Sequence, residues 1–199
     1  NGNFIVDNSI KKLGNYNPDF ILGLNNNFKF KNWDFSFLLD WRQGGNLISR
    51  TLALGAVGGQ LIETENRPQE GIVAKGVVNT GTAENPIWEK NTKAISAESY
   101  YRQYYDRNHE ENNMYNASYL KLRQVYLSYT FKSKNNEGWL KDNKSFSVAF
   151  IARNVWAWSS IPHFDPEQLA VQGNRFVSGV EDMSYPSARS YGLKLLLQF

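Results

Sequence analysis

The most informative stretch of the sequence is WDFSFLLDWRQ, residues 33–43. Its apolar side chains occupy every second position from Trp33 to Trp41, and the positions between them are polar except for Leu38. Successive side chains of a β-strand point to opposite faces, so a period of two predicts a strand with one apolar and one polar face.

Residues 20–30, FILGLNNNFKF, repeat this pattern directly before it. Only Lys31 and Asn32 separate the two stretches, and so short a connection predicts an antiparallel hairpin of strands at about 19–31 and 33–43. Eleven residues that rise about 3.3 Å each and tilt near 40° cover roughly 28 Å, which is close to the apolar band of a transmembrane barrel.

Three further segments alternate in the same way, which predicts strands at about 117–131, 144–158 and 187–199. Together these strands provide an apolar face that we interpret as facing a membrane. The predicted membrane-facing residues are Phe28, Phe30, Trp33, Phe35, Phe37, Leu39, Trp41, Leu127, Tyr129, Phe146, Val148, Phe150, Leu193, Leu195 and Leu197.

The last strand ends the sequence on an aromatic residue. An alternating terminal strand that closes on phenylalanine resembles the signal by which the outer-membrane insertion machinery selects barrel proteins. The predicted barrel-assembly signal consists of Tyr191, Leu193, Leu195, Leu197 and Phe199.

The connections alternate between short and long, as they do in barrels with short periplasmic turns and long external loops. If Phe199 lies at the periplasmic end, 31–32 and 132–143 are periplasmic, and 44–116 and 159–186 are extracellular loops. Six glycines argue against a continuous helix up to about Pro86, so we expect irregular structure there. Ser96 and Ser99 then predict a short capped helix with a tyrosine stripe, a pattern that usually serves packing.

These features predict an all-β fold, an antiparallel transmembrane β-barrel with long extracellular loops. Five strands cannot close a barrel around such loops, so the remaining strands are expected upstream. The alternative is a soluble β-sandwich, a carbohydrate-binding or adhesion module, in which the apolar faces meet each other across a core.

Composition excludes several classes of function. The formal charge is +3 without a basic block, so no nucleic acid is expected as a partner. There is no cysteine, and His109 beside Glu110 and Glu111 lacks the spacing of a metal site, so neither a metal nor another cofactor is expected. No apolar run reaches the length of about 18 residues that a transmembrane helix requires.

Enzymatic activity is also disfavoured, and no catalytic residue is assigned. Asp165 with Glu167, or Glu181 with Asp182, provides the two carboxylates that a glycosidase needs. In a Pro-rich loop, however, such carboxylates usually fix turns or face water.

Substrate binding is the class of function that these exclusions leave. Aromatic rings stack on sugar faces, and polar groups bind hydroxyl or peptide groups. Arg42 has a second possible role, an internal ion pair with Asp40 on the polar face. The predicted substrate-binding residues are Arg42, Trp88, Tyr101, Tyr105, Trp156, Trp158, His163 and Phe164.

Several segments, taken in order, resemble the C-terminal part of SusC/RagA family TonB-dependent outer-membrane transporters. They are NPDFILGL at 17–24, the stretch from Phe35 to DWRQGG at 40–45, ASYLKLR at 117–123, ARNVW at 152–156, FDPE at 164–167 and SYP at 184–186.

The resemblance implies that residues 1–199 are the C-terminal segment of one receptor barrel domain, the last five strands of a plugged barrel of roughly 22 strands. It implies a multi-pass location in the outer membrane of a Gram-negative bacterium and import of oligosaccharides or peptides. The implied partners are a SusD-like surface lipoprotein, the remainder of the barrel and plug, outer-membrane lipid, and TonB. The plug domain and the TonB-contacting segment are N-terminal in the family, so we expect both to be absent from this chain.

Overall fold

The computed structural model describes residues 2–7, 9–132, 145–172 and 174–198. The expected turn at 132–143 falls almost wholly outside these residues, as does Phe199. The chain divides into two units. The sheet unit comprises Tyr16–Asn46, Asn116–Gln168 and Tyr185–Phe199, and the loop unit comprises Asn1–Asn15, Leu47–Tyr115 and Leu169–Ser184.

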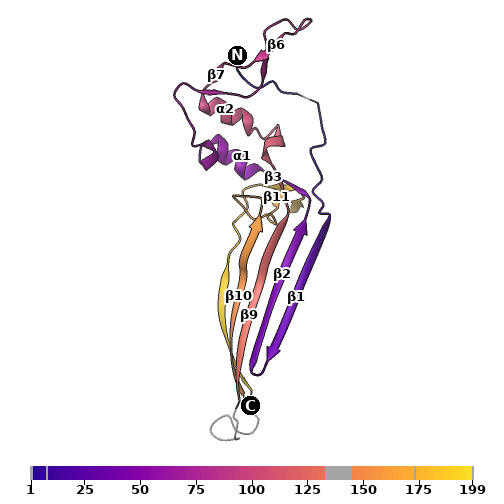
Figure 1. The fold of residues 1–199 in the computed structure, drawn as a ribbon, viewed down its shortest axis with the longest axis vertical. Coiled ribbons are helices and arrows are strands. Elements are labelled where there is room, and N and C mark those ends of the chain that lie inside the picture. Colours follow the sequence, from indigo (N-terminus) through magenta and orange to yellow (C-terminus); the bar gives the residue numbers. More distant parts are fainter. Residues whose placement is uncertain (1, 8, 133–144, 173, 199) are drawn as a thin grey trace. The chain divides into compact units, whose positions relative to one another are not determined.

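The sheet unit is built on a five-stranded sheet whose strands lie side by side in the order β1-β2-β9-β10-β14 (Figure 1). All four neighbouring pairs are antiparallel. The strands are β1 Phe20–Phe30, β2 Trp33–Gln43, β9 Tyr119–Lys132, β10 Ser145–Ser159 and β14 Ser190–Gln198. Each bound lies within three residues of its predicted position, and the all-β class is confirmed.

The register joins the apolar positions of the five strands into one continuous face. One cross-strand row runs through Phe28, Phe35, Leu127, Phe150 and Leu193. The neighbouring rows follow the same alternation, so every predicted membrane-facing residue lies on this face.

Within the sheet unit, no described element covers the apolar face. Leu195, in the middle of β14, is 67% exposed, and Phe28 and Leu193 are exposed as well. A β-sandwich would bury such residues against a second sheet. In the described part of the chain β1 and β14 are the two edges of this sheet.

The opposite face is polar, and a β-bulge interrupts it in β9. Gln124 pairs with Leu38 of β2, but Leu122 pairs with the next residue, Leu39, so Arg123 is an extra residue in β9. A bulge of this kind places two successive side chains on the same face. Arg123 and Gln124 therefore both lie on the polar face.

The loop unit contains two helices and several small sheets. Helix α2, Ala97–Tyr104, forms where Ser96 and Ser99 predicted it, because Ser96 Oγ accepts a hydrogen bond from the Ser99 N–H (3.2 Å). The other elements are helix α1 Arg50–Val57 and the 3-10 turns η1 Ile62–Thr64 and η2 Glu110–Asn113. A three-stranded sheet contains, in this order, β13 Val180–Glu181, β3 Asn46–Ser49 and β8 Met114–Asn116. Two-stranded sheets pair β4 Ile72–Val73 with β7 Ala94–Ile95, β5 Val77–Asn79 with β6 Trp88–Lys90, and β11 Ala170–Gln172 with β12 Arg175–Val177.

Helix α1 corrects the expectation of irregular structure in this region. Ser49 caps it by accepting a hydrogen bond from the Leu52 N–H (3.0 Å), and the helix buries Leu52, Ala53 and Ala56. Burial of this apolar stripe outweighs the poor helix propensity of Gly55. Among the described residues, no helix combines the length and apolar character needed to cross a membrane.

Candidate functional site

A cluster of partly buried ion pairs lies on the polar face of the sheet unit. Strands β9 and β2 and the segment that follows β10 supply its side chains. We call it the ion-pair cluster, and its members are Asp40, Tyr119, Lys121, Arg123, Asp165 and Glu167.

Lys121 occupies the centre of the cluster and is 4% exposed. Its Nζ lies 2.6 Å from Glu167 Oε2 and also contacts Asp165 Oδ1. Burying an ammonium group costs several kcal/mol unless anions surround it. The two carboxylates meet that requirement.

Arg123, the bulged residue, joins Glu167 to the wall of the sheet. Its Nε donates to Asp40 Oδ2 (2.9 Å), and its two terminal nitrogens contact both carboxylate oxygens of Glu167. The Tyr119 ring lies 4.8 Å from Lys121 Nζ and 5.7 Å from the Arg123 guanidinium, which adds cation–π attraction. The Tyr119 hydroxyl donates to Glu167 Oε1 (3.1 Å).

The two carboxylates come from a tight turn, Asp165-Pro166-Glu167. Asp165 Oδ1 accepts the Glu167 N–H (3.0 Å) and Asp165 O accepts the Gln168 N–H (3.0 Å). Burial tends to raise the pKa of both acids, but hydrogen bonds from Lys121 to Asp165 and from Arg123 and Lys121 to Glu167 outweigh it. The pKa of Asp165 is therefore lowered, and that of Glu167 falls to about 2. Neither fits a general acid, which needs a raised pKa.

The predicted ion pair between Asp40 and Arg42 is wrong. Asp40 pairs with Arg123, which the bulge brings to the same face. Arg42 instead donates through Nη2 to Tyr16 O (2.7 Å), and its buried Nε has no hydrogen-bond partner in the described part of the chain.

The predicted substrate-binding residues are divided between the two units. Trp156 and Trp158 pair with Leu122 and Leu120, so they lie on the apolar face together with Trp41, which also pairs with Leu120. His163 and Phe164 directly precede Asp165 in the sheet unit.

The remaining predicted substrate-binding residues belong to the loop unit. Tyr101 is 8% exposed and donates its hydroxyl to Asn66 O (2.9 Å), which gives it a packing role. Burial raises the pKa of Tyr105 to about 12. Trp88, in β6, is 55% exposed.

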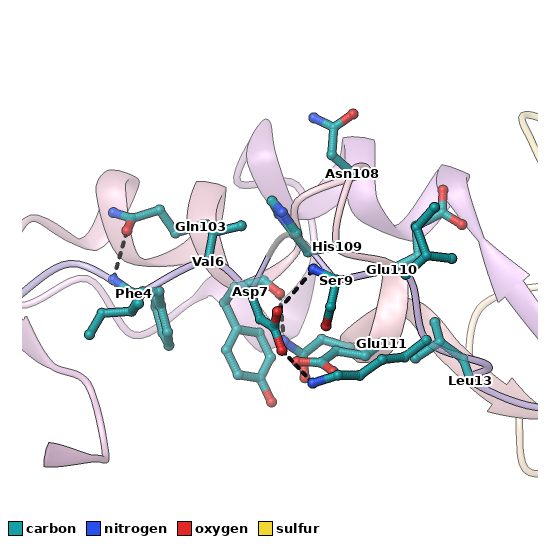
Figure 2. A pocket seen from close by; sticks show the side chains of 15 residues that line it. Phe4, Val6, Asp7, Ser9, Leu13, Gln103, Asn108, His109, Glu110 and Glu111 are labelled. Atoms are coloured by element: carbon teal, nitrogen blue, oxygen red, sulfur yellow. Dashed lines mark hydrogen bonds and ion pairs between the residues drawn. The ribbon is translucent and has the colours of Figure 1, made fainter.

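The loop unit also contains a hollow of about 600 Å³ that the sequence did not indicate. Figure 2 shows it between the N-terminal segment around Phe4 to Leu13 and the segment from Gln103 to Glu111. The Phe4 N–H donates to Gln103 Oε1 (3.0 Å), which ties one wall to the other. The volume suits a small ligand. Among the described residues no group of His, Asp and Glu side chains could hold a metal ion.

No protein-family profile matches the chain. Two curated relatives from Formosa agariphila are TonB-dependent receptor P3, 24% identical over 95% of the chain, and TonB-dependent receptor P39, 26% identical over its full length. The chain spans 17% and 18% of these relatives.

Two solved structures of the RagAB peptide importer, in its open-open and closed-closed states, match 92% of the chain with TM-scores of 0.53 and 0.55. Sequence identity is 17% and 16%, and the chain covers 17% of each matched chain. The predicted resemblance to TonB-dependent receptors of the SusC/RagA kind is therefore confirmed.

Proposed function

We propose that this chain forms part of the wall of a TonB-dependent outer-membrane importer, as the last five strands of a plugged barrel of roughly 22 strands. The observation that carries the proposal is the continuous apolar face of β1, β2, β9, β10 and β14, which no described element of the sheet unit covers. Lipid would cover this face, and the rest of the barrel would pair with the edges at β1 and β14.

The dimensions and the tryptophans of the sheet support this assignment. Strands β1 and β2 each contain 11 residues, the length that a tilted strand needs to cross a bilayer. Trp33 begins β2, and Trp41 lies near the other end of that strand. Trp41 and Trp158 both pair with Leu120 of β9, so they lie in one cross-strand row. Tryptophans at both ends suit the two aromatic girdles of a membrane barrel.

We assign the long connections to the extracellular side and the short turns to the periplasm. The three segments of the loop unit then belong to external loops, and Phe199 lies at the periplasmic end as part of the assembly signal. This orientation follows from the rule that barrel proteins have short periplasmic turns and long external loops.

The cargo and partners follow from the resemblance. Oligosaccharides or peptides are the proposed substrates, a SusD-like lipoprotein is the proposed surface partner, and TonB would act through parts of the protein outside this chain. The solved structures that the chain resembles belong to a peptide importer, which favours peptides. Arg42, Trp88, His163 and Phe164 are the best placed substrate contacts, because they lie neither on the apolar face nor in the interior packing of the loop unit.

Fractionation of the full-length protein tests the proposal. We expect it in the outer-membrane fraction, soluble only in detergent, with the slower gel migration after heating that marks an unfolded barrel. A monodisperse monomer in detergent-free buffer would instead support the soluble β-sandwich module, whose apolar faces are buried.

A further inference from the structure

We infer that residues 160–168 form an internal strap, held on the polar face of the sheet by Lys121 and Arg123. Under the proposed function, on which this step rests, the polar face lines the passage through the barrel. The strap is then a fixed part of the passage wall, and Lys121 and Arg123 are positioning residues.

The strap is attached near both of its ends within the sheet unit. At its start, Ser160 Oγ donates to Asn116 O (2.8 Å), and Ile161 is buried. Near its end, Asp165 and Glu167 bind Lys121 and Arg123 of β9. These contacts join positions more than 40 residues apart in the sequence, so the strap is not held by local turn structure alone.

The charges of the ion-pair cluster favour the arrangement in which the strap lies on the polar face of the sheet. Three carboxylates, Asp40, Asp165 and Glu167, surround Lys121 and Arg123, and the side chain of Lys121 is only 5% exposed. Lifting the strap would remove both carboxylate partners of Lys121 at once. Lys121 would then be a buried charge without a partner, and leaving a buried charge uncompensated is strongly unfavourable.

The β-bulge makes this attachment possible. Val125 and Leu127 lie on the apolar face, and strict alternation would place Arg123 and Lys121 there too. The extra residue reverses the alternation, so both cations point to the polar face. Bulges that redirect a side chain in this manner are usual beside functional sites.

The strap changes what a substrate would meet. Lys121 and Arg123 are neutralised by the chain's own carboxylates, so they are not available to bind an anionic cargo. At this level the passage is instead lined by the strap, which exposes Pro162 and His163. The ion-pair cluster therefore shapes the passage instead of binding cargo directly.

Hydrogen exchange of the full-length protein in detergent tests the strap. In Lys121→Met, we expect backbone amides of residues 160–168 to exchange at least about tenfold faster, because the strap opens locally. Lys194→Met is the matched control, since Lys194 is an exposed lysine on the same polar face of β14. It should leave the exchange unchanged.

Two rescue variants separate positioning from general damage. Lys121→Arg keeps the charge and should retain slow exchange. Lys121→Glu combined with Asp165→Lys should restore an ion pair that Lys121→Glu alone destroys.

If Lys121→Met lowers the amount of folded protein, Glu167→Gln provides the same exchange test with a milder change. Exchange in residues 160–168 that stays slow in both Lys121→Met and Glu167→Gln would overturn the strap. The exchange readout does not depend on import, so a failure of the proposed function is recognised separately, by the fractionation experiment.

Discussion

The sheet unit and the loop unit place their apolar side chains in opposite ways. In the sheet unit, large residues such as Leu195 are exposed in rows along one face. In the loop unit, Leu52 is 2% exposed, and Ala53 and Ala56 of the same helix are buried as well. The loop unit thus has the interior of a water-soluble domain, whereas the sheet unit needs an apolar surrounding to cover its outer face.

The largest effect is expected from a substitution that creates a new cavity in the interior of the loop unit. Leu52→Ala should destabilise α1 and its surroundings by about 2 to 5 kcal/mol, because it removes buried methyl groups without refilling the space. Hydrogen exchange of residues 50–57 in the full-length protein measures the change. Leu54→Ala, an exposed position of the same helix, is the control and should have little effect. Equal effects at both positions would show that this unit lacks a soluble type of core.

The corresponding test of the sheet unit is a substitution that places a charged side chain on its apolar face. Leu195→Arg should cost about 2 to 4 kcal/mol if the residue lies near the middle of a bilayer. Lys194→Ala, on the polar face, should be mild. Folding titrations of the full-length protein into lipid vesicles measure both variants. If they are tolerated equally, the apolar face does not meet lipid and the contrast between the two units disappears.

A smaller effect is expected where the loop unit joins two distant segments. The buried Glu181 carboxylate accepts hydrogen bonds from Ser49 Oγ (2.7 Å) and Thr51 Oγ1 (2.5 Å), and Ser49 also caps α1. In Glu181→Gln one hydroxyl loses its acceptor, so we expect a loss of about 1 to 3 kcal/mol in the local stability of this unit.

Hydrogen exchange of residues 46–57 and 179–184 measures this loss. Glu84→Gln, at an exposed glutamate of the same unit, is the matched control. Unchanged exchange in Glu181→Gln would mean that the two segments are held together by other contacts.

The two units also differ in how far the sequence predicts them. A strand with one apolar and one polar face has its pattern written in adjacent residues, so β2 and its neighbours lie close to their predicted bounds. The loop unit depends on pairings such as Val180 with Ile48, which join residues more than 100 positions apart. Strands as short as these carry no periodic signal. The sequence did not predict α1, because Gly55 argues against a helix and the burial of Leu52, Ala53 and Ala56 is known only from the structure.

The ion-pair cluster was missed for a related reason. Strict alternation in β9 places Lys121 and Arg123 among apolar side chains, and only a bulge resolves that conflict. Two cations on the apolar side of an otherwise regular strand are the signal that could have predicted both the bulge and nearby acidic partners. The partner acids were visible in FDPE at 164–167, but nothing local connects that turn to β9.

The smallest effect is expected from mild acidification, because the carboxylate of Glu167 in the strap should stay charged at a pH at which exposed carboxylates are already protonated. The pKa of Glu167 is lowered to about 2 from a usual value of 4.5. A lowered pKa contributes stability that is present above the usual value and is lost only as the pH falls through the lowered one. Between pH 7 and about 4.5 the strap should therefore stay closed.

Digestion with pepsin at a series of acidic pH values checks this expectation on the full-length protein. Cleavage beside Phe164 should begin only as the pH approaches about 2, when Glu167 is protonated and releases Arg123 and Lys121. In Glu167→Gln, which lacks the charge at every pH, the same cleavage should already occur at the highest pH at which pepsin is active. If the unaltered protein is cut as readily as Glu167→Gln near pH 4, the carboxylates titrate like solvent-exposed acids, and the polar face of the sheet is open instead of strapped.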